Sequence, residues 1–427
     1  MSLMVRISGF LQNLWGNLAA PTWRERLVYL FFFFTTFHAA FLKPHVTLVP
    51  GERSKLFAGL LGMIAMLVAF IFIRGAWRKL RSVEGAVSLV LLLLALASGL
   101  TSDYSRVALA RGFVVMASGL GGFWCARILL DTPSRRFAFA WYEAFLLAGM
   151  LAVALSTFAL GGNVWDHLDF NQHPLVARMV LMSFAALVMI FRKRSWLRIS
   201  GVLLLGLSFT VFSLSSLRSA MFMPLVIGGA LLVVGIIRIR KAWAFALPIM
   251  LIIGAIFYYT SLMESKLPGD YYRLESYAFS WEVAKERPLL GIGLMAPRDA
   301  YLDDYEMYFD NMTRETFINT VKYLISSENV FLTFMVGLGI PFAVIYGSSV
   351  LTLYILLVRR RRHANRGMTL PFPALLFPIT AGLLHFLVSD GLMQPQVSWF
   401  FHILLGMIPV RDEMCCPETG DSAAAPV

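Results

Sequence analysis

The chain has 427 residues, of which 58% are hydrophobic and only 15% are charged. A soluble domain carries about a quarter charged residues and under half apolar ones, so this composition excludes an ordinary soluble protein. The formal net charge of +12 at pH 7 would indicate a nucleic-acid partner in a soluble chain. Here the basic residues lie in short clusters between apolar runs, so no nucleic-acid partner is expected.

Apolar runs long enough to cross a hydrocarbon core of about 30 Å recur along the whole chain. No cleavable signal peptide is expected, because the first apolar run follows an amphipathic segment of 26 residues and lacks a small-residue cleavage site. In chain order the runs predict twelve membrane spans, near residues 27–42, 56–73, 84–100, 107–128, 137–160, 174–191, 199–214, 221–237, 242–260, 329–358, 371–388 and 396–410.

The loops that follow every second span are basic, and the alternate loops carry little basic charge. This alternation predicts that the basic loops are cytoplasmic, and it makes the predicted fold an all-α polytopic bundle with both termini inside. The predicted organisation is a cytoplasmic N-terminal segment (1–26), spans 1–9 (27–260), a large periplasmic loop (261–328), spans 10–12 (329–410) and a cytoplasmic tail (411–427).

The loop over residues 261–328 holds 12 of the 25 acidic residues, together with seven basic residues and many aromatic ones. A loop this long is usually functional or disordered, and its aromatic content is unlike that of a disordered linker. Its stretch SWEVAKERPL predicts an amphipathic helix ended by Pro288 and Gly291. We therefore expect function to concentrate here.

Two arginines stand at the predicted outer surface. Arg218 lies in SSLRSA between two apolar runs, and Arg273 lies in YYRLESYAFSW at the start of the loop's first expected helix. One interpretation is that Arg218 reaches outward to phospholipid headgroups. The other is an anion site, because a guanidinium presents a fork of donors that matches phosphate.

Four motifs, in this order, resemble segments of the O-antigen ligase and polymerase superfamily, and they cover about residues 165–345. They are DFNQHPLVA with Asn171 and Pro174, SSLRSA with Arg218, RLESYAFSWEVAKERPLLGIG with Arg273, Trp281, Pro288, Gly291 and Gly293, and ENVFLTFMVGLG with Asn329, Leu332 and Gly339.

Two departures from the family pattern bear on the activity. Ligases usually carry a histidine before the asparagine of the last motif, where this chain has Glu328, and Pro341 and Phe342 stand where a second glycine is expected after Gly339. The missing histidine favours a polymerase of O-antigen or exopolysaccharide. A ligase that transfers glycan to lipid A-core stays as the alternative.

The resemblance implies an inner-membrane glycosyltransferase with a periplasmic active site and an undecaprenyl-pyrophosphate-linked glycan as donor. The acceptor would be a saccharide, or lipid A-core in a ligase, and membrane lipids surround the chain. Fixed cations stabilise a departing pyrophosphate without a metal or cofactor. The residues expected in catalysis are Glu328 as the base, Arg218 and Arg273; those expected to bind substrate are Arg218, Arg273, Trp281, Tyr277, Asn329 and His173.

Other assignments stay open. Glu328 could equally cap the tenth span, where a negative charge near a helix N-terminus is favourable. His173 is the second candidate for the base, and a hydrogen-bonded interfacial role for it is the simpler interpretation. Ionisable residues inside spans are functional candidates by default; here they are Arg111, Arg178, His385 and His402. A secondary transporter or a glycolipid flippase would also have twelve spans, but carriers often contain repeated halves, and the two halves of this sequence show no convincing repeat.

Overall fold

The structure is a computed structural model that describes residues 22–41, 53–103, 105–159, 172–192, 194–214, 277, 280–294, 329–359, 372–387 and 391–408. Within these residues the chain is 88% helical and has no strand, which confirms the all-α prediction. The helices are α2 (Trp23–Phe41), α3 (Arg53–Phe72), α4 (Ala76–Lys79), α5 (Val83–Thr101), α6 (Ser105–Leu129), α7 (Pro133–Ala159), α9 (Gln172–Ile190), α10 (Ser195–Leu214), α16 (Val330–Leu338), α17 (Ile340–Arg359), α19 (Phe372–Leu387), the 3-10 helix η2 (Gly391–Met393) and α20 (Pro395–Gly406).

Each predicted span among these residues coincides with a helix to within a few residues, except the span predicted over 329–358. Four described helices are long and apolar enough to cross a membrane: Val83–Thr101, Ala108–Leu129, Pro133–Ser156 and Ile340–Arg359. The predicted spans 221–237 and 242–260 lie outside the described residues, as do the C-terminal segment, residues 1–21 of the N-terminal segment and most of the loop 261–328. The count of twelve spans therefore stays a prediction. Residues 23–26, predicted to precede the first span, are already part of α2.

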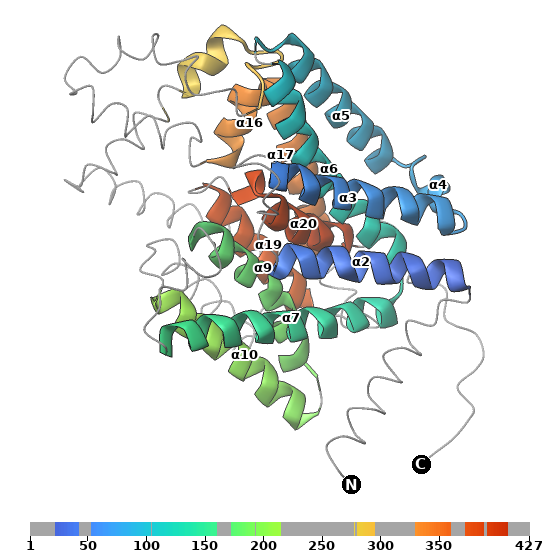
Figure 1. Ribbon diagram of the computed structural model, residues 1–427, viewed down its shortest axis with the longest axis vertical. Coiled ribbons are helices and arrows are strands. Elements are labelled where there is room, and N and C mark those ends of the chain that lie inside the picture. The colour runs from blue at the N-terminus through green and yellow to red at the C-terminus, as the bar shows by residue number, and fades with distance from the viewer. Residues whose placement is uncertain are drawn as a thin grey trace, which may run out of the picture.

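The bundle is organised around α6 and α9 (Figure 1). Helix α6 packs against α3, α5 and α20, and α9 packs against α7, α10, α19 and α20. Side chains of α9 and α20 are buried nearly all round, as expected of helices that face protein on every side. The helices of the rim, such as α5, instead expose large apolar side chains, as expected of a surface that faces lipid.

Glycines on α6 let two neighbouring helices approach its backbone closely. A Cβ atom added at Gly121 would lie 2.6 Å from the carbonyl oxygen of Gly62 on α3. One added at Gly122 would lie 2.6 Å from the carbonyl oxygen of Trp399 on α20. Small residues at contact points are how helices gain packing contacts in a membrane, where lipid competes equally for apolar side chains.

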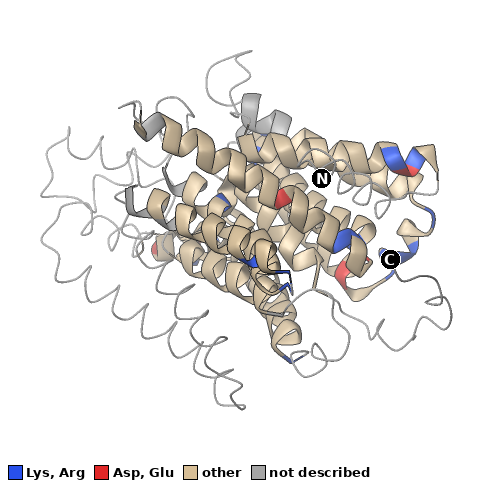
Figure 2. Cartoon of the chain, turned by 90° about the horizontal axis from the view of Figure 1, so that it is seen from below, with Lys and Arg blue, Asp and Glu red and all other residues tan. Residues whose placement is uncertain are grey.

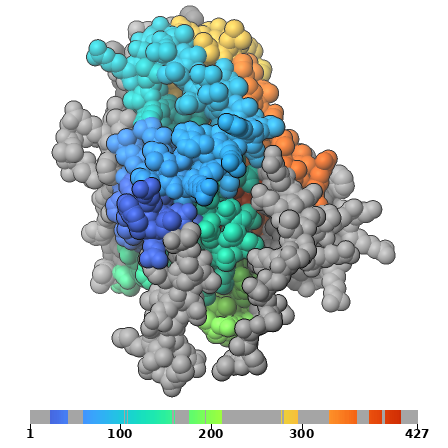
Figure 3. All heavy atoms as spheres, turned by 90° about the vertical axis from the view of Figure 1, so that its right-hand side faces the viewer, coloured from blue at the N-terminus to red at the C-terminus, as the bar shows by residue number. Residues whose placement is uncertain are grey.

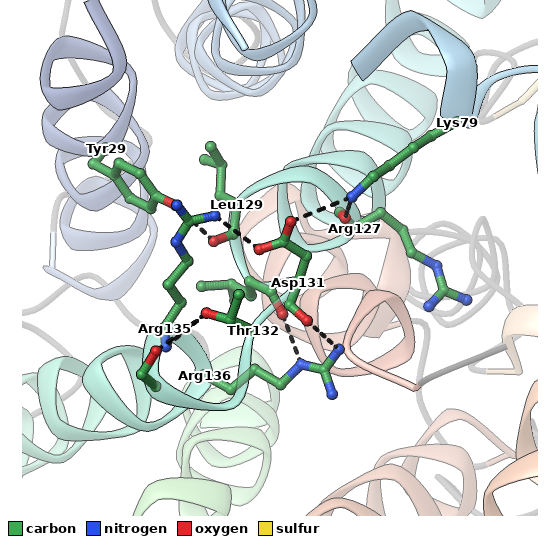
Figure 4. A network of polar contacts seen from close by, with 10 residues as sticks. Tyr29, Lys79, Arg127, Leu129, Asp131, Thr132, Arg135 and Arg136 are labelled. Atoms are coloured by element: carbon green, nitrogen blue, oxygen red, sulfur yellow. Dashed lines mark hydrogen bonds and ion pairs between the residues drawn. The ribbon is translucent and has the colours of Figure 1, made fainter. Parts of the chain in front are cut away.

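Side chains from neighbouring segments cap the C-terminus of α6 at one end of the bundle (Figure 4). The last carbonyls of a helix have no partner within it, and here other elements supply donors. Tyr29 donates to the Leu129 carbonyl (2.8 Å), Lys79 to the Arg127 carbonyl (2.7 Å) and Arg136 to the Leu130 carbonyl (2.6 Å). Positive charge at this helix end also opposes the helix dipole.

The carboxylate of Asp131 joins the same network, 2.8 Å from Arg135 and 3.7 Å from Lys79. The network thus brings together the loops 74–81 and 131–136, which the sequence predicts to share the cytoplasmic side. Viewed from below in Figure 2, charged residues gather mostly near helix ends, and the long middle stretches of the helices are largely uncharged. Which end faces the cytoplasm stays a prediction from the basic loops.

Candidate functional site: a helix break filled by a glycine turn

The span predicted over 329–358 is wrong as a single helix, because the chain breaks at Gly339 into α16 and α17. Gly339 has φ of 88°, a left-handed value that favours glycine. Its N–H still donates to the Met335 carbonyl at 3.1 Å, which closes the last turn of α16. Pro341 then stands in the first turn of α17, where proline's missing N–H costs no helical hydrogen bond.

The residues 288–294, here called the glycine turn, fill this break. Backbone groups around a helix break have no partner within the helices and are costly inside a membrane. The glycine turn supplies partners on both sides through three backbone hydrogen bonds. Ile292 N–H donates to the Val336 carbonyl (2.9 Å), Gly293 N–H to the Gly337 carbonyl (3.0 Å), and Ile340 N–H to the Pro288 carbonyl (2.8 Å).

Glycines on both surfaces make this contact sterically possible. Gly291 has φ of 64° and Gly293 has φ of 97°. A Cβ at Gly339 would lie 2.5 Å from the carbonyl carbon of Leu289, and one at Gly337 would lie 2.9 Å from the side chain of Leu294. The spacing of Pro288, Gly291 and Gly293, which resembles that of the family, thus has a physical reason: it lets the backbone of the glycine turn contact the backbone of the α16–α17 break directly.

The C-terminal end of α5 binds both α16 and the glycine turn. The Ser98 hydroxyl donates to the Gly337 carbonyl at 2.7 Å, and the Ser102 hydroxyl donates to the Ile292 carbonyl at 2.6 Å. In the space-filling view of Figure 3, the segment 280–294 (yellow) lies at the top, between the α5–α6 region (cyan) and α16–α17 (orange). The sequence analysis did not predict a role for either serine, although their spacing of four places both on one side of the C-terminal end of α5.

The helix expected within SWEVAKERPL is present over residues 280–286 and ends before Pro288. Trp281 on this helix is 46% exposed, and the Lys285 ammonium lies 5.9 Å from the centre of its ring. Tyr277 lies just before the helix and is half-buried. A partly exposed indole is suited to stacking on a sugar ring, and the same ring is suited to a membrane interface.

An ion pair between Arg287 and Asp103, 3.1 Å long, joins the end of the 280–286 helix to the loop after α5. Both side chains are largely exposed, so the pair adds little stability. It does bring together two loops that the sequence predicts to share the outer side.

Asn329 caps α16 and ties it to α19. Its side-chain oxygen accepts from the N–H groups of Phe331 (3.0 Å) and Leu332 (3.2 Å). Its amide nitrogen donates to the carbonyl of Leu387 at the end of α19 (3.1 Å). These bonds fix the first turn of α16 and its position against the end of α19.

The structure describes no side chain of the remaining predicted site residues. Arg218, Arg273 and Glu328 lie outside the described residues. His173 lies in the first turn of α9, but its side chain is not among those described. Their predicted roles are therefore neither supported nor opposed by contacts.

Two ionisable residues of the spans have structural partners. The buried Arg178 guanidinium donates to the carbonyls of Ala39 (3.1 Å) and Ala40 (2.9 Å) in the last turn of α2, so it caps that helix. His402 is bonded through one ring nitrogen to the Ser398 carbonyl (2.7 Å) and through the other to the Tyr346 hydroxyl (3.2 Å). These bonds explain why both polar groups are tolerated inside the bundle.

Fold and site together define a polytopic helical membrane protein in which a loop segment is docked on a broken helix. Residues 203–347 match the family described as O-Antigen ligase. The match supports the resemblance to the O-antigen ligase and polymerase superfamily that the motifs predicted, over this part of the chain; that family is of a glycosyltransferase type. Curated proteins yield no match to the chain.

Proposed function

We propose that the chain is a glycosyltransferase of the bacterial inner membrane that moves a glycan from an undecaprenyl-pyrophosphate carrier onto a saccharide, as an O-antigen or exopolysaccharide polymerase. The family match over residues 203–347 carries the proposal. That segment includes every residue to which we assign catalysis, namely Arg218, Arg273 and Glu328.

In the proposed reaction, a hydroxyl oxygen of the acceptor attacks the anomeric carbon of the donor glycan. The bond from that carbon to the pyrophosphate oxygen breaks, and undecaprenyl pyrophosphate leaves. Glu328 takes the hydroxyl proton, provided that it lies within hydrogen-bond reach. Arg218 and Arg273 stabilise the charge that grows on the leaving oxygen.

The glycine turn supports this proposal by linking the parts of the site. The segment from Leu294 to Asn329 leaves from one end of α16 and returns to the other, because Leu294 packs on Gly337 and Asn329 caps the first turn. A nine-residue helix is about 13 Å long. Leu294, at the end of the glycine turn, and Asn329, which directly follows the proposed base in sequence, therefore lie at the two ends of one short helix.

The same break argues against the transporter alternative. In carriers, broken helices leave backbone groups open to the substrate or coupling ion. Here the Val336 and Gly337 carbonyls and the Ile340 N–H bind the chain's own glycine turn. These backbone groups at the break are therefore not open to a transported substrate.

A ligase is the second candidate, and it is favoured by the description of the matching family as O-Antigen ligase. A deletion strain separates the two activities. Loss of a polymerase leaves lipopolysaccharide with a single repeat unit, whereas loss of a ligase leaves full-length polymer that is not attached to lipid A-core. Normal, attached polymer in the deletion strain would contradict both.

A further inference from the structure

We propose that Ser98 on α5 and Ser102, directly after α5, are positioning residues for the transfer reaction: Ser98 binds α16 at Gly337, Ser102 binds the glycine turn at Ile292, and together they keep the turn docked on the α16–α17 break. The inference rests on the proposed function and adds two residues that lie outside the matched segment 203–347.

The bonds made by these serines differ from those of most other serine and threonine hydroxyls that the structure describes. A serine or threonine in a membrane helix commonly donates to the carbonyl four residues earlier in its own helix. Thr35, Ser200, Ser208 and Ser349 all do so. Ser98 and Ser102 instead donate to carbonyls that are 239 and 190 residues away in sequence.

Both serines bind carbonyl groups at the contact between the glycine turn and α16. Ser98 is completely buried, and its hydroxyl shares the Gly337 carbonyl with the N–H of Gly293. The Ser102 hydroxyl binds the Ile292 carbonyl, while the Ile292 N–H binds α16. The peptide units at Ile292 and Gly293 are therefore fixed between two helices.

This arrangement bears on the reaction because α16 carries the residues that flank the segment 295–328, whose last residue is the proposed base Glu328. Leu294 begins that segment and Asn329 ends it, directly after Glu328. A base must be held at hydrogen-bond distance from the proton it accepts. Release of the turn would allow one end of the segment to move relative to the other, with no loss of any group that touches the substrate.

The test uses the full chain in lipid nanodiscs and three variants: Ser98→Ala, Ser102→Ala and the double variant. Thr101→Ala is the matched control, because Thr101 is exposed on the same helix turn and its hydroxyl bonds only to carbonyls of α5. Hydrogen–deuterium exchange measures the amides of residues 288–294, and peptides from α6 and α9 report on the rest of the fold. Transfer is measured with the lipid-linked repeat unit extracted from membranes of the strain that carries the chain.

We expect faster exchange in residues 288–294 of the double variant, with unchanged exchange in α6 and α9. We expect kcat to fall about tenfold, as for a small misplacement of catalytic groups, while KM for the donor stays within about twofold. Thr101→Ala should match the wild type in both measurements. Unchanged exchange in the turn would overturn the proposal, as would faster exchange with wild-type kcat. Absence of transfer by the wild-type protein would instead contradict the proposed function itself.

Discussion

Replacement of Gly339 by alanine tests the docking of the glycine turn on the helix break. The backbone at Gly339 has a positive φ of 88°, which costs a residue with a Cβ about 1–3 kcal/mol. The new methyl group would also overlap the Leu289 carbonyl and push the turn off the break. Three backbone hydrogen bonds would then be lost, at about 0.6 kcal/mol each for interhelical bonds in membranes. The expected loss in the free energy of unfolding is about 3–5 kcal/mol.

The assay is reversible unfolding of the purified chain in mixed detergent micelles, followed by helix content. Gly347→Ala on α17 is the matched control, because an added Cβ there meets only Phe331 at an ordinary 3.5 Å. Its free energy of unfolding should stay within about 1 kcal/mol of the wild type. If Gly339→Ala is as stable as Gly347→Ala, the turn does not depend on close backbone contact, and our account of the break is refuted.

Three further predictions concern the catalytic residues and the topology. Arg218→Ala and Arg273→Ala should each abolish polymer formation with normal membrane insertion, and lysine should rescue poorly because it lacks the guanidinium fork; near-wild-type activity of Arg273→Ala would refute the paired-arginine site. Glu328→Gln should abolish transfer, because an amide keeps the size but cannot accept the proton; if polymer still forms at the normal rate, the base lies elsewhere and His173 is the next residue to replace. Cysteines placed at Asp304 and at Ser195 should be labelled from opposite sides of the membrane; equal labelling from outside would reverse the predicted orientation.

The sequence predicted the helices well because apolar runs and basic loops are strong local signals. The ends of α5, α7 and α9 lie within a few residues of the predicted spans. The break at Gly339 was missed because hydropathy continues through it without interruption from α16 into α17. What ends α16 is a left-handed glycine stabilised by a segment some 50 residues earlier in the chain, and such a contact has no hydropathy signal.

Only part of the candidate site was predicted, because several of its contacts join residues far apart in the sequence. The motif around Pro288 and Gly291 was recognised by resemblance, and the structure adds the physical purpose of its glycines. Asn329 was expected to bind substrate; its cap of α16 is local, but its bond to the Leu387 carbonyl, 58 residues away, has no sequence signal. Ser98 and Ser102 were passed over because a pair of serines four residues apart is common in membrane helices, and only the fold reveals their distant acceptors.

The most direct test of the central claim is transfer by the purified chain in vesicles that contain the undecaprenyl-pyrophosphate-linked repeat unit and no nucleotide sugar. The account predicts that free undecaprenyl pyrophosphate appears in step with longer glycan chains, and that both products disappear in Arg273→Ala. Release of the carrier without glycan growth, or growth that does not depend on Arg273, would contradict it.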